Sequence, residues 1–223
     1  GTDHHELVVS PADARQVIPM LATMYDEPFG DSSQIPTFLL SQLAREHVTV
    51  ALSGDGGDEL FGGYDRYRHL DRLRGIRRSL PGPVSRLVAA AIGGIPSERW
   101  DRWGEGPLGR LGPAVLRRRL GHRAHKVARV LGAGGVDDVY RAMMAAENDA
   151  GSLVRGSTGR PSGAFEGSGF SDRSGFEQAM LMDTLAYLPD DLLTKVDRAS
   201  MAVSLEARVP LLDPAVFEFA WRL

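Results

Sequence analysis

No cysteine occurs among the 223 residues of this chain. Its absence excludes a disulfide framework, a thiolate metal site and a cysteine nucleophile. Long apolar runs are missing as well. None approaches the roughly 18–20 residues that span a bilayer, and the longest candidate, Leu87 to Ile95, is interrupted by two glycines. We therefore expect a soluble protein with no membrane partner.

Charge of one sign is not in excess. The 26 Lys and Arg residues are balanced by 29 Asp and Glu residues, and the formal net charge is −3. This balance removes the whole-chain electrostatic case for nucleic acid as a partner. The first residues, Gly1 to Glu6, lack the basic and apolar regions of a signal peptide, which favours a cytoplasmic location.

The order of apolar residues predicts an α/β fold at the start of the chain. Short strands are expected at residues 6–10 and 48–52, the second as a continuous apolar run buried on both faces. Helices are expected at residues 11–25 and 35–46, the first of them started by the capping residue Ser10. Strands that alternate with helices indicate a parallel sheet.

The remainder of the chain predicts mainly helices. Their spacing favours residues 66–80, 83–92, 97–103, 113–120, 123–131, 136–147, 176–187, 190–203 and 214–223. Residues 151–175 are rich in Gly, Ser and Arg and lack an apolar period, so we expect a mobile loop there. The expected organisation is an α/β part over residues 1–64 and a mostly helical part over residues 65–223.

A glycine-rich stretch, Ser53-Gly-Asp-Gly-Gly-Asp-Glu-Leu-Phe-Gly-Gly-Tyr64, follows directly after the second expected strand. In an open α/β sheet, ligands bind at the carboxyl ends of the strands. Gly54, Gly56 and Gly57 have no Cβ and would let the backbone approach a nucleotide closely. Two common nucleotide signatures, G-x-x-x-x-G-K-(S/T) and G-x-G-x-x-G, are not matched here.

The same stretch carries three carboxylates, Asp55, Asp58 and Glu59. Because neighbouring carboxylates repel each other and any bare phosphate, a divalent cation is the natural partner, and oxygen ligands suit Mg²⁺. The alternative is a structural turn followed by a helix start, where acidic residues stabilise the helix dipole.

Three charged residues near the carboxyl end are spaced for one helix face. Asp191, Lys195 and Arg198 stand at i, i+4 and i+7 of an expected helix. Two cations held by a carboxylate would suit a polyphosphate. The alternative is an ordinary solvated charged face.

Together the two stretches resemble the carboxyl-terminal synthetase domain of glutamine-hydrolysing asparagine synthetases and their relatives. The resemblance rests on the glycine-rich stretch and on Lys195-Val-Asp-Arg-Ala-Ser-Met201 with Glu206-Ala-Arg-Val-Pro-Leu-Leu-Asp213. Weaker agreement at Gly1-Thr-Asp-His-His-Glu6 and Tyr25-Asp-Glu-Pro28 extends it over nearly the whole chain.

The resemblance implies part of a parallel nucleotide-binding sheet of the ATP-pyrophosphatase type, similar to adenine nucleotide alpha hydrolases, with a large helical half. It also implies ATP-dependent amide formation as in asparagine biosynthesis. Mg-ATP adenylates a carboxylate, pyrophosphate leaves, and ammonia from a glutaminase domain attacks the acyl-adenylate. The implied partners are therefore a small-molecule carboxylate and ammonia, and a homodimer is a further expectation.

The resemblance also implies roles for single residues. The residues that would bind the nucleotide are Ser53, Gly54, Gly56 and Gly57. Asp58 would bind Mg²⁺, and the residues that would take part in catalysis are Asp55, Lys195 and Arg198. Asp55 stands where relatives carry Asp or Glu, a position linked to forming the acyl-adenylate. Lys195 and Arg198 would be the cations on the pyrophosphate side, and Arg198 stands where some relatives carry the catalytic Lys.

Several departures from the family pattern accompany these matches. The Ser-Gly-Gly-x-Asp-Ser pyrophosphate loop and the amino-terminal cysteine of the glutaminase domain are missing. We therefore expect a fragment of one synthetase domain that by itself neither makes ammonia from glutamine nor turns over ATP efficiently. The loop Glu27-Pro-Phe-Gly-Asp31 lacks the Thr-Thr and Arg of aspartate-using relatives, and Asp31 would repel an aspartate substrate.

The acceptor is therefore open. One alternative within the same chemistry is amidation of another carboxylate, on a surface-polysaccharide sugar or in a lactam-forming relative. A distant alternative is a nucleic-acid-binding module, because basic residues gather at 66–78 and 117–129. Few aromatic residues interleave with them, so solvated helix faces explain these runs better and no nucleic acid partner is expected.

Overall fold

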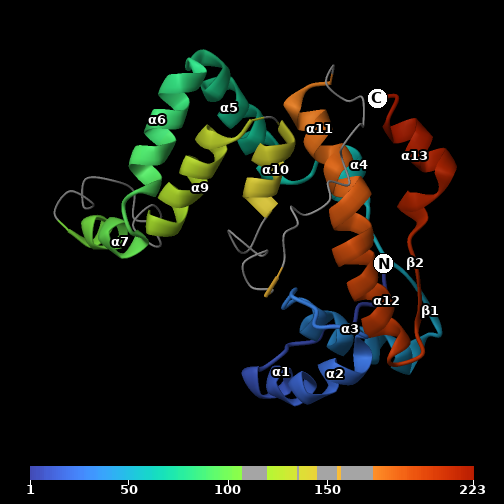
Figure 1. Cartoon of the computed structure of the whole chain (residues 1–223). Coiled ribbons are helices and arrows are strands. Elements are labelled where there is room, and N and C mark those ends of the chain that lie inside the picture. Colours follow the sequence, from blue (N-terminus) through green and yellow to red (C-terminus); the bar gives the residue numbers. More distant parts are fainter. Residues whose placement is uncertain (107–119, 135, 145–154, 157–172) are drawn as a thin grey trace. The chain divides into compact units, whose positions relative to one another are not determined.

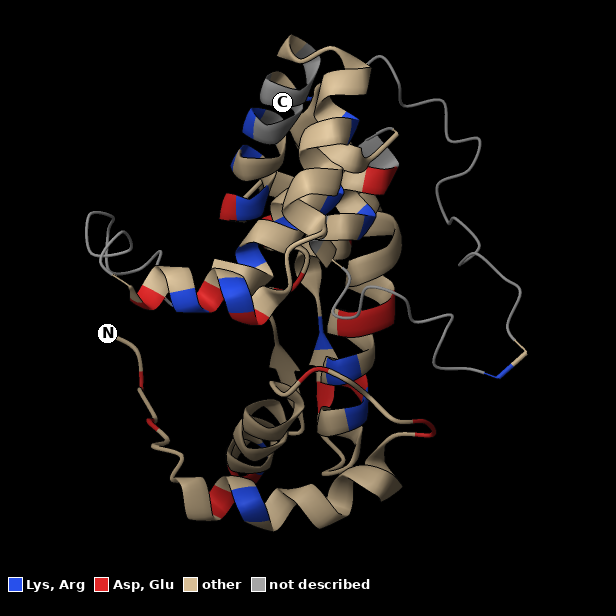
Figure 2. Cartoon of the chain, turned by 60° about the vertical axis from the view of Figure 1, so that its left-hand side comes forward, with Lys and Arg blue, Asp and Glu red and all other residues tan. Residues whose placement is uncertain are grey.

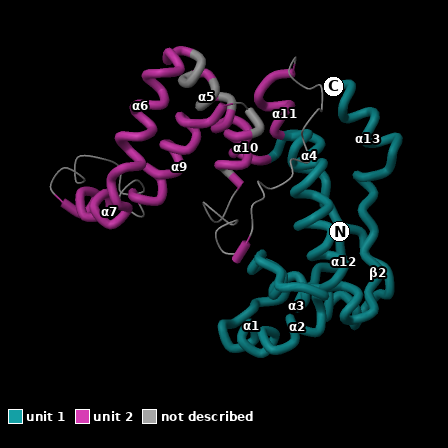
Figure 3. Tube along the Cα trace, viewed as in Figure 1, with its two compact units in different colours: residues 1–63, 180–223 teal, residues 64–179 magenta. Residues whose placement is uncertain are grey.

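The computed structural model describes residues 1–106, 120–134, 136–144, 155–156 and 173–223 (Figure 1). The chain divides into two compact units. Residues 1–63 and 180–223 form the first unit and residues 64–179 the second (Figure 3). The carboxyl-terminal residues thus belong with the amino-terminal ones, and the second unit is inserted between them in the sequence.

Helices form the first part of unit 1. They are α1 (Pro11–Val17), the 3₁₀ turn η1 (Ile18–Met20), α2 (Leu21–Met24) and α3 (Gln34–His47). Ser10 caps α1 in a reciprocal pair of hydrogen bonds with Asp13, as a capping box requires. The single helix expected at residues 11–25 is divided because Pro19 has no N–H to donate, and the tighter 3₁₀ turn accommodates it.

A small parallel sheet lies next in unit 1. Strand β1 (Val50–Leu52) pairs in parallel with β2 (Glu206–Arg208), in the register Val50 with Glu206 and Leu52 with Arg208. The parallel arrangement is as predicted. The expectation that the strand at residues 48–52 is buried on both faces is wrong, since Leu52 of β1 is 72% exposed. Pairing satisfies the backbone of the two strands along their shared edge and does not by itself cover their faces.

The strand expected at residues 6–10 is also wrong. Residues 1–10 have no regular secondary structure, and Val8 is exposed. A short alternation of apolar residues specifies a strand only when another strand is beside it to take up its backbone hydrogen bonds. The two-stranded sheet of the described residues pairs β1 with β2 and gives residues 6–10 no such partner.

The glycine-rich stretch continues from β1 into α4 (Gly57–Phe61). The carboxyl-terminal part of the chain re-enters unit 1 through a long helical run. That run consists of α11 (Gly175–Met182), the π-helix η4 (Asp183–Leu193) and α12 (Thr194–Met201). The break expected between residues 187 and 190 is therefore absent. The chain passes Pro189 in π-helical form, and the Thr194 hydroxyl donates to the Pro189 carbonyl over 2.9 Å.

After β2, the short turn η5 (Pro210–Leu212) leads to α13 (Pro214–Ala220). The core of unit 1 is formed where the amino-terminal helices meet α12. Val17 of α1, Phe38 of α3 and Ala199 of α12 are buried there, and Leu21 and Val203 pack against them. This core fixes α12 beside α3.

The regular secondary structure of the described part of unit 2 consists of helices, as the sequence predicted. Its helices are α5 (Asp65–Ser79), α6 (Gly82–Gly93), α7 (Ser97–Glu105), α9 (Leu120–Gly132) and α10 (Val136–Met144). Helix α9 is central to the unit and packs against α6, α7 and α10. Most of the helix expected at 113–120 and most of the mobile loop expected at 151–175 lie outside the described residues. No helix in the described ranges combines the length and apolar character that crossing a bilayer demands.

Candidate functional site

The glycine-rich stretch makes a tight turn at the end of β1. The Ser53 N–H donates to the Arg208 carbonyl over 2.8 Å, which extends the pairing of β1 with β2 by one residue. The Ser53 hydroxyl lies 2.5 Å from Asp55 Oδ2 and accepts from the Asp55 N–H. The Gly57 N–H then donates to the Gly54 carbonyl over 3.2 Å. Serine, aspartate and backbone thus hold one another in place.

At two of the three glycines a Cβ would crowd a leucine side chain. Gly56 is left-handed, with φ +84°, and a Cβ there would lie 2.5 Å from Leu212 Cδ2. A Cβ on Gly57 would lie 3.1 Å from Leu211 Cδ1. A Cβ on Gly54, in contrast, would meet no atom within 4 Å, so the surroundings of this residue are open to a ligand. Leu211 and Leu212, which belong to the carboxyl-terminal signature, thus pack directly on the glycine-rich stretch.

The three carboxylates of the stretch do not converge as expected. On α4, Asp58 is exposed, whereas Glu59 is buried, because successive residues of a helix point in different directions. In the described ranges no three His, Asp or Glu side chains stand together as metal ligands. Asp58 remains a single exposed carboxylate. This donor fits an Mg²⁺ ion that arrives with phosphates and waters, because Mg²⁺ commonly takes only one or two protein carboxylates.

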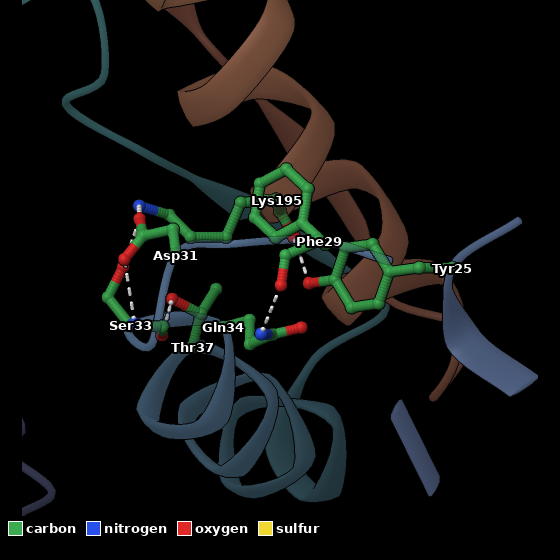
Figure 4. Close-up of polar contacts among 7 residues, drawn as sticks. All are labelled: Tyr25, Phe29, Asp31, Ser33, Gln34, Thr37 and Lys195. Atoms are coloured by element: carbon green, nitrogen blue, oxygen red, sulfur yellow. Dashed lines mark hydrogen bonds and ion pairs between the residues drawn. The ribbon is translucent and has the colours of Figure 1, made fainter. Parts of the chain in front are cut away.

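The two cations of α12 are paired with carboxylates of the loop between α2 and α3. Figure 2 marks the basic and acidic positions along the ribbon in blue and red. Lys195 Nζ lies 2.6 Å from Asp31 Oδ2 (Figure 4). Arg198 Nη2 lies 3.8 Å from Asp26 Oδ2. The carboxylates seen to hold these two cations are Asp31 and Asp26 of the loop, whereas the helical spacing predicted Asp191. Asp191 lies in the π-helical η4, where the angular spacing of residues differs from that of an α-helix, and the carboxylate that reaches the lysine comes from the loop.

Asp31 is fully engaged by its neighbours. Besides Lys195, it accepts hydrogen bonds from the Ser33 N–H at 2.8 Å and the Ser33 hydroxyl at 2.6 Å. Its backbone carbonyl accepts from the Gln34 N–H at the start of α3. The acidic charge that was expected to repel an aspartate substrate is therefore neutralised by an ammonium group.

A hollow of about 460 Å³ lies at the start of the loop between α2 and α3, and its lining includes Leu21, Tyr25, Asp26, Phe29 and Gln34. Tyr25 and Phe29 stack there, with ring centroids 4.8 Å apart. The Tyr25 hydroxyl donates to the Lys195 carbonyl over 3.5 Å, and Gln34 Nε2 donates to the Phe29 carbonyl over 3.1 Å (Figure 4). Burial raises the pKa of the Tyr25 phenol, and the negative charges of Asp31 and Asp191 raise it further.

The stability of the chain should depend on the ionisation of Asp31. Burial alone would raise the pKa of this carboxyl, but hydrogen bonds from Lys195 and Ser33 outweigh burial and lower it from 3.8 to about 2. A carboxyl whose pKa is lower in the folded than in the unfolded chain stabilises the fold at pH values above the unfolded pKa of 3.8. This contribution is lost as the pH falls from 3.8 to about 2. The free energy of urea unfolding should therefore fall more steeply in this window for the wild type than for Asp31→Asn. Parallel curves for the two proteins would contradict the assignment.

The structure brings parts of the two stretches together. Residues 50–53 pair with residues 206–208, Leu211 and Leu212 pack on the glycine loop, and α4 packs against η4, the segment that leads into Lys195. Within the described part of the chain, no hydrogen bond or ion pair joins Asp55 or Asp58 to Lys195 or Arg198. Sequence reasoning missed the Asp31 partner of Lys195, because that loop follows no helical or strand period.

The asparagine synthase family model matches residues 1–223. The chain is 28% identical, over 226 residues, to asparagine synthetase (glutamine-hydrolysing) 1 of Bacillus subtilis, covering 100% of this chain and 32% of that protein. It is 31% identical, over 231 residues, to a Mycobacterium bovis protein provisionally named asparagine synthetase (glutamine-hydrolysing), covering 100% of this chain and 31% of that protein.

The chain therefore spans about a third of the length of these curated relatives. No solved structure shows a significant match. The match of the family model over the full sequence, on a chain whose two signature stretches meet at one end of a parallel sheet, shows that this chain belongs to the asparagine synthase family.

Proposed function

We propose that this chain is the nucleotide-binding part of an enzyme that forms an amide at the expense of ATP. The carboxylate of an acceptor attacks the α-phosphorus of ATP, the bond to pyrophosphate breaks, and ammonia then displaces AMP from the acyl-adenylate. The observation that carries the proposal is the contact between the glycine loop and residues 206–212, which joins the two family signatures at the carboxyl end of β1.

The proposal gives each part of the loop a task. Gly54 is the open position where the backbone would approach the nucleotide, while Gly56 and Gly57 fix the turn against Leu212 and Leu211. Ser53 would contact the nucleotide through its backbone and would hold Asp55 in orientation through its hydroxyl. Asp55 would then act next to the reacting carboxylate and the incoming ammonia.

Asp58 would hold Mg²⁺, which supplies neutralisation of phosphate charge when it is bound. Lys195 and Arg198 would lie on the pyrophosphate side. We further propose that β1 and β2 belong to an ATP-pyrophosphatase type of sheet, that a glutaminase domain of the full-length gene product supplies the ammonia, and that the enzyme is a cytoplasmic homodimer.

Aspartate is the acceptor that the names of the relatives suggest. The Lys195 ammonium neutralises Asp31, so the loop carries less repulsion toward an aspartate than its sequence indicated. Another carboxylate, such as one on a sugar of a surface polysaccharide, is the second candidate, because the loop Glu27-Pro-Phe-Gly-Asp31 lacks the Thr-Thr and Arg of aspartate-using relatives.

The test is pyrophosphate–ATP exchange by the full-length gene product, with aspartate and with uronic acids as acceptors. We expect exchange that requires both Mg²⁺ and one of these carboxylates, with ammonium salts replacing glutamine in amide formation. Formation of ADP and phosphate in place of AMP and pyrophosphate would refute the proposal, and so would exchange that ignores every added carboxylate.

A further inference from the structure

The two units carry opposite charge. Unit 2, residues 64–179, contains 20 Lys and Arg residues against 12 Asp and Glu residues, whereas unit 1 contains 6 against 17. The net charge of −3 over the whole chain therefore hides a basic unit and an acidic one. Within unit 2, helix α5 alone has six Arg and two Asp residues. Unit 2 by itself is thus suited to an anionic partner.

Cations on α5 are free of carboxylate partners. Arg68 and Arg72 stand one turn apart on this helix, and both are exposed. Neither forms an ion pair with any residue in the part of the chain that the structure describes. The cations of unit 1 that pair with carboxylates are, by contrast, Lys195, Arg198, Arg208 and Arg222. The arginines of α5 are therefore available to an external anion.

Helix α6, which follows α5 in the chain, turns an apolar face to solvent. Its other side packs on α9, where the Ser85 hydroxyl donates to the Leu131 carbonyl over 2.6 Å (Figure 1). The exposed residues at i, i+3, i+4 and i+7, which share the solvent face, are Val84, Leu87, Val88 and Ala91. Leu87 is 71% exposed. Exposed apolar surface of this kind is typical of a site that contacts a protein or a membrane.

An exposed tryptophan lies beyond the carboxyl-terminal end of α6. Trp100 of α7 donates from its Nε1 to the Ile92 carbonyl over 3.3 Å, and the Trp103 ring packs edge-to-face on it, with centroids 5.2 Å apart. Trp103 is 48% exposed. Tryptophan is enriched at the level of lipid headgroups, because its ring is apolar and its N–H is polar.

We propose that α5, α6 and Trp103 form a surface that binds membranes containing anionic lipids. The apolar face of α6 enters the boundary between headgroups and acyl chains, while the arginines of α5 bind lipid phosphates through their planar guanidinium groups. The expectation of no membrane partner rested on the lack of a spanning run, and a helix that lies in the interface needs no such run. The inference goes beyond the proposed function and does not depend on it.

Two other occupants fit this surface less well. A nucleic acid would bind the arginines of α5 but would leave the apolar face of α6 uncovered. A second copy of unit 2 would cover that face, but it would bring one basic unit against another. An anionic lipid surface accommodates the cations and the apolar face together.

Co-sedimentation of the full-length gene product with lipid vesicles tests the inference. The vesicles consist of phosphatidylcholine, either alone or with about a third of it replaced by phosphatidylglycerol. We expect the wild type to partition at least about 10-fold more strongly into the anionic vesicles, and added salt should reduce the difference.

Leu87→Gln tests the apolar face and should weaken partition into anionic vesicles by about 5- to 20-fold, because a side chain that enters the acyl boundary becomes polar. The matched control is Leu40→Gln on α3 of unit 1, where the leucine is 60% exposed. This control should partition like the wild type. Since both positions are exposed, both variants should keep the urea unfolding midpoint of the wild type.

The double variant Arg68→Gln/Arg72→Gln tests the cations. It should weaken partition into anionic vesicles by about 10- to 30-fold and leave partition into pure phosphatidylcholine unchanged. The control is Arg15→Gln/Arg45→Gln, which removes the same charge from helices α1 and α3 of unit 1 and should have no effect.

Several results would overturn the inference. They are a wild type that stays in solution with both kinds of vesicle, and variants of α5 or α6 that partition like their controls. Binding of duplex DNA without binding of vesicles would assign the arginines to nucleic acid instead. A wild-type dimer that Leu87→Gln separates into monomers, with no vesicle binding, would assign the apolar face to a second copy.

Discussion

Asp58→Asn should reduce kcat/KM for Mg-ATP in the full-length gene product by about 100- to 1,000-fold. The substitution keeps the shape of the side chain and removes its charge. Asp58 is exposed and stands at the start of α4, directly after the turn that follows β1. If this carboxylate holds the Mg²⁺ of the nucleotide, its loss weakens the neutralisation of phosphate charge at the step in which pyrophosphate leaves.

A matched control separates this role from a structural one. Asp65 is an exposed carboxylate in the first turn of α5, so Asp65→Asn changes a helix dipole in the same way as Asp58→Asn. Asp65→Asn should leave exchange activity near the wild-type value. A loss in Asp58→Asn that is no greater than in this control would show that Asp58 only stabilises a helix start. Rates measured over a range of Mg²⁺ concentrations should show a raised requirement in Asp58→Asn.

Gly56→Ala should lower the free energy of unfolding by about 2–5 kcal/mol, a large part of the stability of an ordinary domain. Two causes add up. A left-handed backbone costs any residue with a Cβ about 1–2 kcal/mol, and overpacking typically costs about 1–3 kcal/mol more. The second cause applies because the new methyl group would lie 2.5 Å from Leu212 Cδ2.

Urea unfolding of the 223-residue chain measures this effect. Gly54→Ala is the control, because a methyl group there meets no atom within 4 Å, and its unfolding midpoint should stay close to that of the wild type. The same control variant tests nucleotide binding, which should weaken if the backbone at Gly54 approaches the ligand. Equal midpoints for Gly56→Ala and the wild type would refute the packing argument.

Local signals in the sequence were sufficient for the elements that are built locally. Ser10 predicted the start of α1, and the apolar run before Ser53 predicted β1, because capping and strand propensity act over a few residues. Strand β2 escaped prediction. Its three residues, Glu206 to Arg208, carry no apolar alternation, and they are a strand only because β1 lies beside them.

The site shows the same division. The glycine loop was predicted, since glycines after a strand carry a strong local signal. The expectation that Asp55, Asp58 and Glu59 together face a divalent cation was wrong, because α4 begins within the loop and turns Glu59 inward. The pairing of Lys195 with Asp31 depends on the packing of α12 against α3, and no periodicity reports a contact over 164 positions.

The pairing of residues 50–52 with residues 206–208 also sets an order of events during synthesis. The glycine loop leaves the ribosome early, but the strand and the leucines that shape it are translated only after all of residues 64–179. The nascent loop therefore lacks its contacts with β2, Leu211 and Leu212 until residues 64–179 have been synthesised. Contacts this distant in sequence form late and slowly. If the glycine loop binds the nucleotide as proposed, binding should appear only once residues 206–212 have been synthesised, and ribosome-bound chains that stop before residue 206 should lack it.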